Sequence, residues 1–242
     1  MINIDNVSFK LPQGLSIIKD ISCSISKHDF VILLGSNGSG KSTLIKLLNR
    51  TYKPSNGEIS LNKKNINKFS DNIYAKKVIT LTQFVRESLF FDLTIEENAL
   101  MIETAYTSQQ FSRPKFCKRL KAYLLKFNAK LGNSLKSPLY NLSGGEQQIL
   151  AFALYLQHQP ELLLLDEHTS ALDPKTAAKI MQFTANIIEK KKLTCVMTTH
   201  NLDFATQYGN RVIALNNGQI VFENQDNQQQ PINRQLLLDK CY

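Results

Sequence analysis

A glycine-rich segment, GSNGSGKST at residues 35–43, constrains the fold of this chain more than any other stretch. It follows the apolar run FVILL and precedes KSTLIKLLNR, where leucines recur at helical spacing, so the order is buried strand, loop, helix. Residues 35–42 match GxxxxGK[ST], in which backbone N–H groups turn inward around phosphate oxygens and glycine permits the torsion angles required. The start of the following helix adds partial positive charge. We therefore expect a nucleotide phosphate site within an α/β fold.

Two side chains of this loop are expected to act on the phosphates. Lys41 should reach the β- and γ-phosphates, and Ser42 should offer its hydroxyl to Mg²⁺. A glycine turn without a ligand is the alternative, and the position between a strand and a helix argues against it. The predicted ATP-binding segment consists of Gly35, Ser36, Asn37, Gly38, Ser39, Gly40, Lys41, Ser42 and Thr43.

Two adjacent carboxylates, Asp166 and Glu167, end the apolar run LLLL. Adjacent residues of an extended chain point to opposite sides, so one acid can face a metal while the other faces water. We predict that Asp166 joins the Mg²⁺ site and that Glu167 polarises the attacking water. A solvated strand end is the alternative, and a phosphate loop elsewhere in the chain weakens it.

The pattern along the chain predicts a P-loop NTPase (RecA-like) core in a single domain, residues 1–242. Residues 1–85 and 149–225 should form this core, because INIDNVSF and IIKDISCSI alternate like antiparallel strands and later segments alternate between strand and helix. The later alternation favours a mostly parallel sheet covered by helices, with a hairpin in RVIALNNGQIVFE. Residues 86–148 should form an inserted helical subdomain, and residues 226–242 a polar C-terminal tail with a short terminal helix.

The composition limits the other classes of protein. In 242 residues the net charge is +9, which suits acidic partners but does not choose among nucleotide, nucleic acid and membrane. Apolar runs are only of strand length, so we expect no membrane span, and the first residues do not resemble a signal peptide. The four cysteines form no CxxC pair, which favours a reducing cytosol over a metal or disulfide framework.

A basic amphipathic segment lies in the helical region, FSRPKFCKRLKAYLLKFNAKL. Such a helix could touch a membrane or nucleic acid, but we favour the interpretation that it packs on its own domain. The lysines at 190–192 are expected to end a helix in solvent. The apolar stripe of the basic segment comprises Phe116, Leu120, Leu124, Phe127 and Leu131.

A further motif, LSGGE at residues 142–146, separates the P-loop families from one another. Together with GSNGSGKST, LLLLDE, SALD and a histidine that ends VMTTH, this motif resembles the ATP-binding subunit of an ABC transporter. The resemblance covers about residues 1–225. It implies an ATPase in which two subunits pack head to tail around two ATP molecules, so that the phosphate loop of one subunit faces LSGGE of the other.

The resemblance also implies roles for single residues. Gln83 would contact the Mg²⁺ or the water, and His200 would contact the γ-phosphate and hold the water. Asp173 would support the dimer interface. The signature segment that contacts the second ATP would comprise Ser143, Gly144 and Gly145, whose position at a helix start favours an anion.

One position departs from the family pattern. Many relatives carry an aromatic residue in the first strands that stacks on adenine, and Leu11 takes that place here, while Phe9 is expected to face the core. Leu11 could still give an apolar contact with weaker base selectivity.

Three functions remain to be compared. The sequence favours the ATPase of an importer, and DEHT with THN resembles the ATPases of tryptophan/tyrosine-type amino-acid import systems. Such a subunit would lie peripherally at the cytoplasmic face of the plasma membrane, with permease subunits and an extracytoplasmic solute-binding protein as partners. The permease would contact residues 84–97, where FVRESLFFDLT is rich in apolar side chains. The alternatives are an exporter ATPase and a soluble ABC ATPase that acts on nucleic acid, and we expect no nucleic-acid partner.

A histidine, His168, follows the catalytic carboxylate where most relatives carry proline. Unlike proline, it leaves φ free, keeps a backbone donor and adds a titratable ring. We favour the interpretation that His168 shapes the turn into SALD, with His200 as the working histidine.

Overall fold

The computed structural model describes residues 1–107, 112–224, 235, 237 and 238. The prediction of a polar tail with a short terminal helix concerns residues that lie almost entirely outside these ranges.

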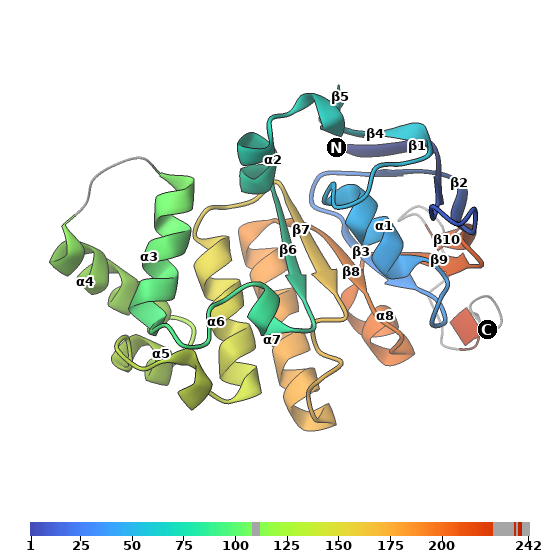
Figure 1. Ribbon diagram of the computed structural model, residues 1–242. Helices are drawn as coiled ribbons and strands as arrows, with labels where there is room; N and C mark the ends of the chain where they lie inside the picture. Colours follow the sequence, from blue (N-terminus) through green and yellow to red (C-terminus); the bar gives the residue numbers. More distant parts are fainter. Residues whose placement is uncertain (108–111, 225–234, 236, 239–242) are drawn as a thin grey trace. The chain divides into compact units, whose positions relative to one another are not determined.

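Two β-sheets form the framework (Figure 1). The four-stranded sheet has the order β2 (Ser16–Ile25), β1 (Ile2–Lys10), β4 (Asn56–Leu61) and β5 (Lys64–Asn65). The six-stranded sheet has the order β10 (Gln219–Asn224), β9 (Arg211–Asn216), β3 (Phe30–Leu34), β8 (Thr194–Thr198), β7 (Leu162–Asp166) and β6 (Val78–Thr82).

The strand directions confirm the predicted fold class. β1 pairs antiparallel with β2 and β4, whereas β3 pairs in parallel with β8 and β9, and β7 with β8. Every residue of β3 and β8 is buried, as expected for central strands that helices cover on both faces. The hairpin β9–β10 adds an antiparallel edge, with Asn217 and Gly218 at left-handed φ values of 47° and 80° in its turn.

The helices occur where the apolar spacing predicts them, and a few short ones join the elements. The 3₁₀ helices are η1 (Ile66–Lys68), η2 (Val85–Glu87) and η3 (Leu139–Asn141). The α-helices are α1 (Lys41–Leu48), α2 (Asp71–Lys77), α3 (Ile95–Tyr106), α4 (Arg113–Leu124), α5 (Ala129–Asn133), α6 (Gly144–Leu156), α7 (Pro174–Lys191) and α8 (Leu202–Tyr208).

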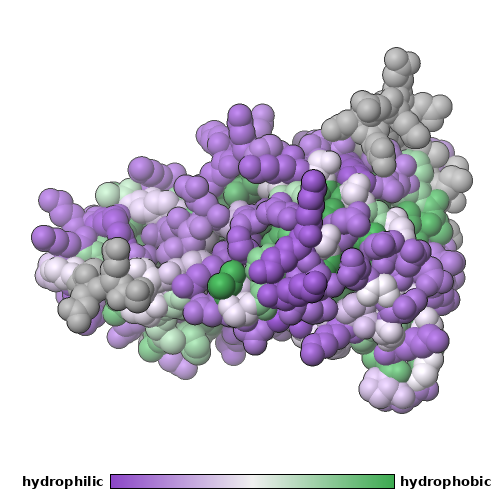
Figure 2. Space-filling view, turned by 90° about the horizontal axis from the view of Figure 1, so that it is seen from above, coloured by the Kyte–Doolittle hydropathy of each residue, from purple (hydrophilic) through white to green (hydrophobic). Residues whose placement is uncertain are grey.

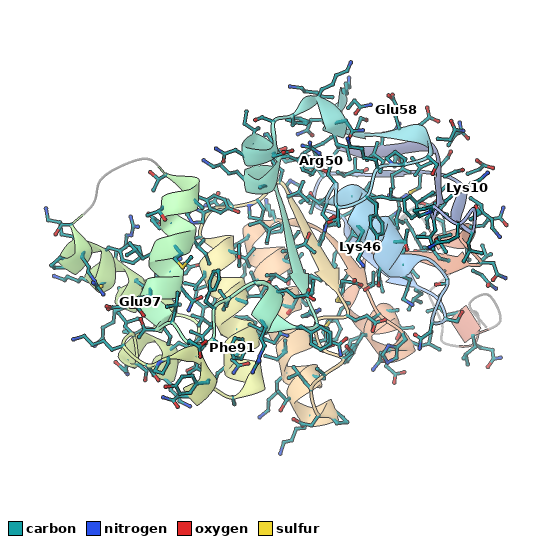
Figure 3. All side chains as sticks on the ribbon, viewed as in Figure 1. Lys10, Lys46, Arg50, Glu58, Phe91 and Glu97 are labelled. Atoms are coloured by element: carbon teal, nitrogen blue, oxygen red, sulfur yellow. The ribbon has the colours of Figure 1, made fainter. Side chains whose placement is uncertain are left out.

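The chain divides into two compact units. The first contains residues 1–80, 160–167 and 184–242, and the second contains residues 81–159 and 168–183. The first unit holds both sheets, except for the end of β6, around a continuous apolar core. One polar pair of this unit involves Arg50, which is labelled in Figure 3. Arg50 donates to Asp71 Oδ1 at 2.8 Å, and its guanidinium lies over the Tyr74 ring.

The second unit is mainly helical, and its basic segment differs from the single stripe that the sequence suggests. Phe116, Leu120 and Leu124 are buried along α4 as expected. The helix then stops, and Asn128 begins α5 by accepting hydrogen bonds from the N–H groups of Lys130 and Leu131. An asparagine side chain can cap a new helix start, which the apolar spacing alone does not reveal.

Hydrophilic residues predominate on the face drawn in Figure 2. Within the described ranges no helix combines the length and apolarity needed to cross a membrane. Of the three lysines at the end of α7, Lys190 and Lys192 are exposed as predicted, whereas Lys191 is half-buried.

Candidate functional site

The glycine-rich loop lies between β3 and α1, as its sequence predicts. Gly40 precedes the helix at φ 107°, and a Cβ there would lie 2.8 Å from Ile18 Cδ1, so both backbone and space require glycine. Lys41 opens α1 and folds back over the loop, where its Nζ donates to the carbonyl oxygens of Gly35 at 2.8 Å and Ser36 at 3.0 Å. The ammonium is thereby held at the mouth of the backbone turn.

A cavity of about 380 Å³ opens beside this loop. Its size falls in the range of small-molecule sites. It is lined by Ile17, Asn37, Gly38, Gly40, Lys41, Ser42, Thr43 and Glu167. Most of the predicted phosphate-binding residues therefore surround one space, together with the predicted catalytic carboxylate.

Asp166 and Ser42 meet although 124 positions separate them in the chain. Ser42 Oγ donates to Asp166 Oδ1 at 3.1 Å, and the Thr198 hydroxyl donates to the same carboxylate oxygen at 2.6 Å. These two contacts fix the carboxylate at the carboxyl end of β7, next to the start of α1. A hydroxyl and a carboxylate are oxygen ligands of the kind that Mg²⁺ prefers.

Glu167 differs from the expectation of an extended chain. Its φ is 47°, so the chain leaves β7 in a left-handed conformation, and its N–H donates to Thr198 Oγ1 at 2.9 Å. The prediction that the two acids alternate along an extended chain is therefore wrong at Glu167, because a turn rather than a strand sets the direction of this side chain. Glu167 Oε1 lies 4.0 Å from Lys41 Nζ and 3.9 Å from His200 Nδ1.

The signature segment begins α6 in the second unit. Ser143 is the N-cap, and its hydroxyl accepts the Glu146 N–H at 3.4 Å while Glu146 Oε2 accepts the Ser143 N–H at 2.8 Å. The N–H groups of Gly144 and Gly145 belong to the first turn, which offers no intrahelical acceptor to them. Ser143 and Gly144 are exposed, so this helix start can receive an anion from outside.

The two glycines of this segment leave room for the SALD segment and the first turn of α7. A Cβ on Gly144 would lie 3.3 Å from Leu172 Cδ2, and one on Gly145 would lie 3.0 Å from Thr176 Cγ2. Asp173 accepts the Thr176 N–H at 3.1 Å, and the hydrogen bonds from Thr176 lower the pKa of its carboxyl. Asp173 therefore begins α7 in this chain, and its place at a dimer interface stays a prediction.

Gln83 follows β6 and belongs to the second unit. Its carbonyl oxygen accepts a hydrogen bond from Nε2 of the buried Gln148 at 3.4 Å. Its backbone is thus tied to α6, and its predicted contact with Mg²⁺ or water stays a prediction.

Leu11, at the position expected to contact adenine, packs against other residues of the first unit. Phe9 faces the core as predicted, stacked on Tyr52 at a centroid distance of 4.9 Å. Leu11 is half-buried and packs against the core of the first unit. Ile17, on the next strand, lines the cavity instead. Ile17 could not be singled out from the sequence, because it is one of several isoleucines in the same strand.

His168 is buried, with 1% of the side chain exposed. Its ring lies 5.5 Å from the Phe152 ring on α6, at an interplanar angle of 59°. Burial lowers the pKa of His168 to about 3, so the ring is neutral at physiological pH. His200 is 57% exposed, and of the two histidines it is the one beside the Glu167 carboxylate.

Thr198 is a functional candidate that sequence reasoning missed. It is buried, and it contacts both Asp166 and the Glu167 backbone. The signal that could have identified it is a threonine that directly follows the apolar residues Cys195, Val196 and Met197 at the end of a buried strand.

The residues present fit ATP with a magnesium ion. The loop offers a helix start and the Lys41 ammonium for phosphates, and loops of this kind cradle phosphate with backbone N–H groups. Ser42 and Asp166 bring a hydroxyl and a carboxylate together for a hard cation. Within the described ranges no cluster of three His, Cys, Asp or Glu side chains suggests a separate metal centre.

Comparison with known proteins gives the family. The family described as ABC transporter matches residues 18–170. The tyrosine transport ATP-binding protein of Clostridioides difficile is 33% identical over 99% of this chain and 98% of its own length. The phosphonates import ATP-binding protein of Lactobacillus acidophilus is 32% identical over 92% of this chain and 88% of its own.

Solved structures agree. The ATP-binding cassette MJ0796, a dimer in a post-hydrolysis state with ADP and Pi, has a TM-score of 0.73 and 28% identity, covering 93% of this chain and 99% of that one. The structure of cbiO1 from Clostridium perfringens, part of an ABC transporter complex, has a TM-score of 0.81 over 98% of this chain and 94% of that one, and its 22% identity supports the fold alone. These findings confirm the family and the fold predicted from the motifs. The chain belongs to the ABC transporter family, as an ATP-binding domain that hydrolyses ATP.

Proposed function

We propose that the chain is the ATPase subunit of an amino-acid importer and works as a head-to-tail dimer with two ATP molecules between the subunits. The observation that supports the proposed dimer is that one chain has two helix starts suited to binding an anion. The phosphate loop before α1 serves the chain's own ATP. The exposed start of α6 at Ser143 then serves the γ-phosphate of ATP on a second copy.

The proposed chemistry assigns one task to each side chain of the site. Lys41 neutralises the β- and γ-phosphates, and Ser42, Asp166 and Gln83 would hold Mg²⁺. The ion would supply positive charge that offsets the negative charge of the phosphates. Glu167 polarises the attacking water, and His200, whose Nδ1 lies 3.9 Å from Glu167 Oε1, orients that water toward the γ-phosphate.

The names of the relatives support the proposed transport role. A relative named for tyrosine transport matches nearly the whole chain, which supports import of an amino acid over export. Phosphonate import is the second candidate, because relatives of that name also match over most of their length. In this proposal residues 1–85 and 149–225 would form the ATP-binding core, residues 86–148 the helical subdomain and residues 226–242 the tail.

The partners would be permease subunits at the cytoplasmic face of the plasma membrane and an extracytoplasmic solute-binding protein. We place the permease contact on residues 84–97 of the second unit. Phe84 and Phe90 are each 58% exposed there, which suits the docking of an apolar helix. This feature favours a membrane protein over nucleic acid as the partner.

The Glu167→Gln variant tests the dimer. It should bind ATP, turn over at least about a hundredfold more slowly, and form dimers with ATP and Mg²⁺ in light scattering. Adding Lys41→Ala should abolish ATP binding and leave monomers. A Glu167→Gln protein that stays monomeric in saturating ATP would refute the sandwich, and wild-type turnover would show that another base exists.

The solute can be tested in vesicles that contain the complete transporter. Tyrosine should stimulate ATP hydrolysis in the presence of the solute-binding protein, and a phosphonate should not. The opposite result would replace amino-acid import by phosphonate import as the function of this chain.

A further inference from the structure

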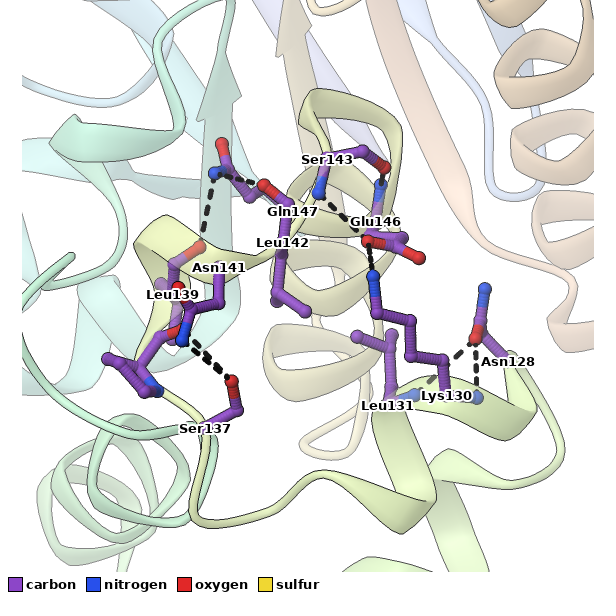
Figure 4. A network of polar contacts seen from close by, with 11 residues as sticks. Asn128, Lys130, Leu131, Ser137, Leu139, Asn141, Leu142, Ser143, Glu146 and Gln147 are labelled. Atoms are coloured by element: carbon purple, nitrogen blue, oxygen red, sulfur yellow. Dashed lines mark hydrogen bonds and ion pairs between the residues drawn. The ribbon is translucent and has the colours of Figure 1, made fainter.

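An ion pair lies at the start of α6, beside the signature segment. Lys130 Nζ is 2.8 Å from Glu146 Oε2, and the same carboxylate oxygen accepts the Ser143 N–H at 2.8 Å (Figure 4). The Glu146 side chain is 18% exposed and that of Lys130 is 52% exposed. The carboxylate therefore stands within the first turn of the helix start that, in the proposed function, receives the γ-phosphate of a second copy.

A carboxylate at this position has two opposing electrostatic effects. On the single chain it stabilises the helix start, because a negative charge complements the dipole and accepts a free N–H group. Toward an arriving γ-phosphate it is a like charge within a Debye length, so it weakens the anion site. Burial opposes its ionisation, but hydrogen bonds from Lys130 and Ser143 outweigh burial and lower the pKa of the Glu146 carboxyl, which keeps it charged.

The position of Lys130 is fixed by the local fold. It lies in the first turn of α5, where the Asn128 side chain accepts its N–H at 2.8 Å. The next residue, Leu131, is fully buried in the second unit. The backbone therefore delivers the Lys130 side chain to Glu146 without relying on the ion pair itself.

We propose that Lys130 is a positioning residue for ATP-dependent association. Its ammonium neutralises the Glu146 carboxylate and holds it on the Ser143 N–H, so that the start of α6 remains an anion site. This inference rests on the proposed function, because it requires that Ser143, Gly144 and Gly145 meet the γ-phosphate of a second copy.

The test measures the ATP concentration that gives half-maximal dimerisation of the Glu167→Gln protein, by light scattering. Lys130→Ala should raise this concentration about tenfold at low salt, and salt near 0.5 M should reduce the effect. Lys130→Arg should behave like the parent. The double change Lys130→Ala with Glu146→Gln should return to within about twofold of the parent, because the repelling charge is gone.

Two controls isolate the electrostatic role. Lys121→Ala removes the same charge from an exposed position on α4 and should leave dimerisation unchanged. ATP binding to the single chain should be equal in all variants, because it depends on the phosphate loop of the first unit. Rescue by Glu146→Gln is the result that a purely structural role of Lys130 would not give.

The outcomes separate this inference from the function on which it rests. A parent that stays monomeric with ATP refutes the dimer and the inference with it. A parent that dimerises while Lys130→Ala has no effect refutes the inference alone. A Lys130→Ala defect that persists after Glu146→Gln also refutes it, since Lys130 would then act directly on the nucleotide or through folding.

Discussion

The burial of His168 predicts an acid-dependent loss of stability. The ring is 1% exposed and packs beside Phe152, and burial lowers its pKa to about 3. In the unfolded chain a histidine has a pKa of about 6.5. The unfolded state therefore binds a proton at a pH where the folded state does not. The contribution of His168 to the free energy of unfolding is complete above about pH 6.5 and is lost progressively toward pH 3.

The size of this effect follows from the two pKa values. Between about pH 7.5 and pH 5.5 the folded ring stays neutral while the unfolded ring becomes about 90% protonated, which costs about 1.4 kcal/mol of folding free energy. For a chain of 242 residues this corresponds to a fall in Tm of roughly 3–6 °C.

Other groups titrate in the same range, so a matched variant must isolate His168. His168→Gln keeps a polar side chain but cannot take up a proton. Both proteins are unfolded in urea at several pH values. As the pH falls from 7.5 to 5.5, the wild type should lose about 1.4 kcal/mol more of its free energy of unfolding than the variant loses. Parallel curves for the two proteins would show that His168 is protonated equally in both states, and would refute its burial as a neutral ring.

Two further predictions concern the second unit. Asn98→Ala should reduce the free energy of unfolding, measured in urea titrations, by about 2–3 kcal/mol. The reason is that the buried Asn98 side chain accepts the Phe90 N–H and donates to the Phe90 carbonyl, both at 2.8 Å. A loss below about 0.5 kcal/mol would mean that water replaces these bonds. Gly145→Val should leave ATP binding by the single chain intact but lower turnover at least tenfold, because its Cβ would press on Thr176 Cγ2 at 3.0 Å. Unchanged turnover in that variant would contradict a close-packed signature helix.

Much of the first unit could be predicted because its chemistry is local in sequence. The phosphate loop needs glycine, lysine and serine at fixed offsets between a strand and a helix, and Gly40 at φ 107° shows why substitution is excluded. The position of Asp166 could be predicted because it ends an apolar strand, so its carboxylate must lie where the strands of the sheet have their carboxyl ends. Its contact with Ser42 follows from the parallel sheet, which brings the carboxyl ends of strands together.

The features that escaped prediction depend on contacts distant in sequence or on single torsion angles. The left-handed φ of Glu167 is supported by the Thr198 hydroxyl from a neighbouring strand, which no spacing within LLLLDEHTS reveals. The end of α4 and the cap at Asn128 depend on a local competition between helix continuation and side-chain hydrogen bonding. The pairing of Lys130 with Glu146 follows from that break, since α5 would otherwise continue α4.

The residues on the two sides of the peptide bond between Glu167 and His168 have different surroundings. The division between the two compact units falls at this bond. On one side the Glu167 N–H is held by Thr198 within the unit of the phosphate loop. On the other side the His168 ring is fixed beside Phe152, on the helix that begins with Ser143. The buried neutral ring favours a structural role for His168. His200, exposed and 3.9 Å from the Glu167 carboxylate, stays the predicted catalytic histidine.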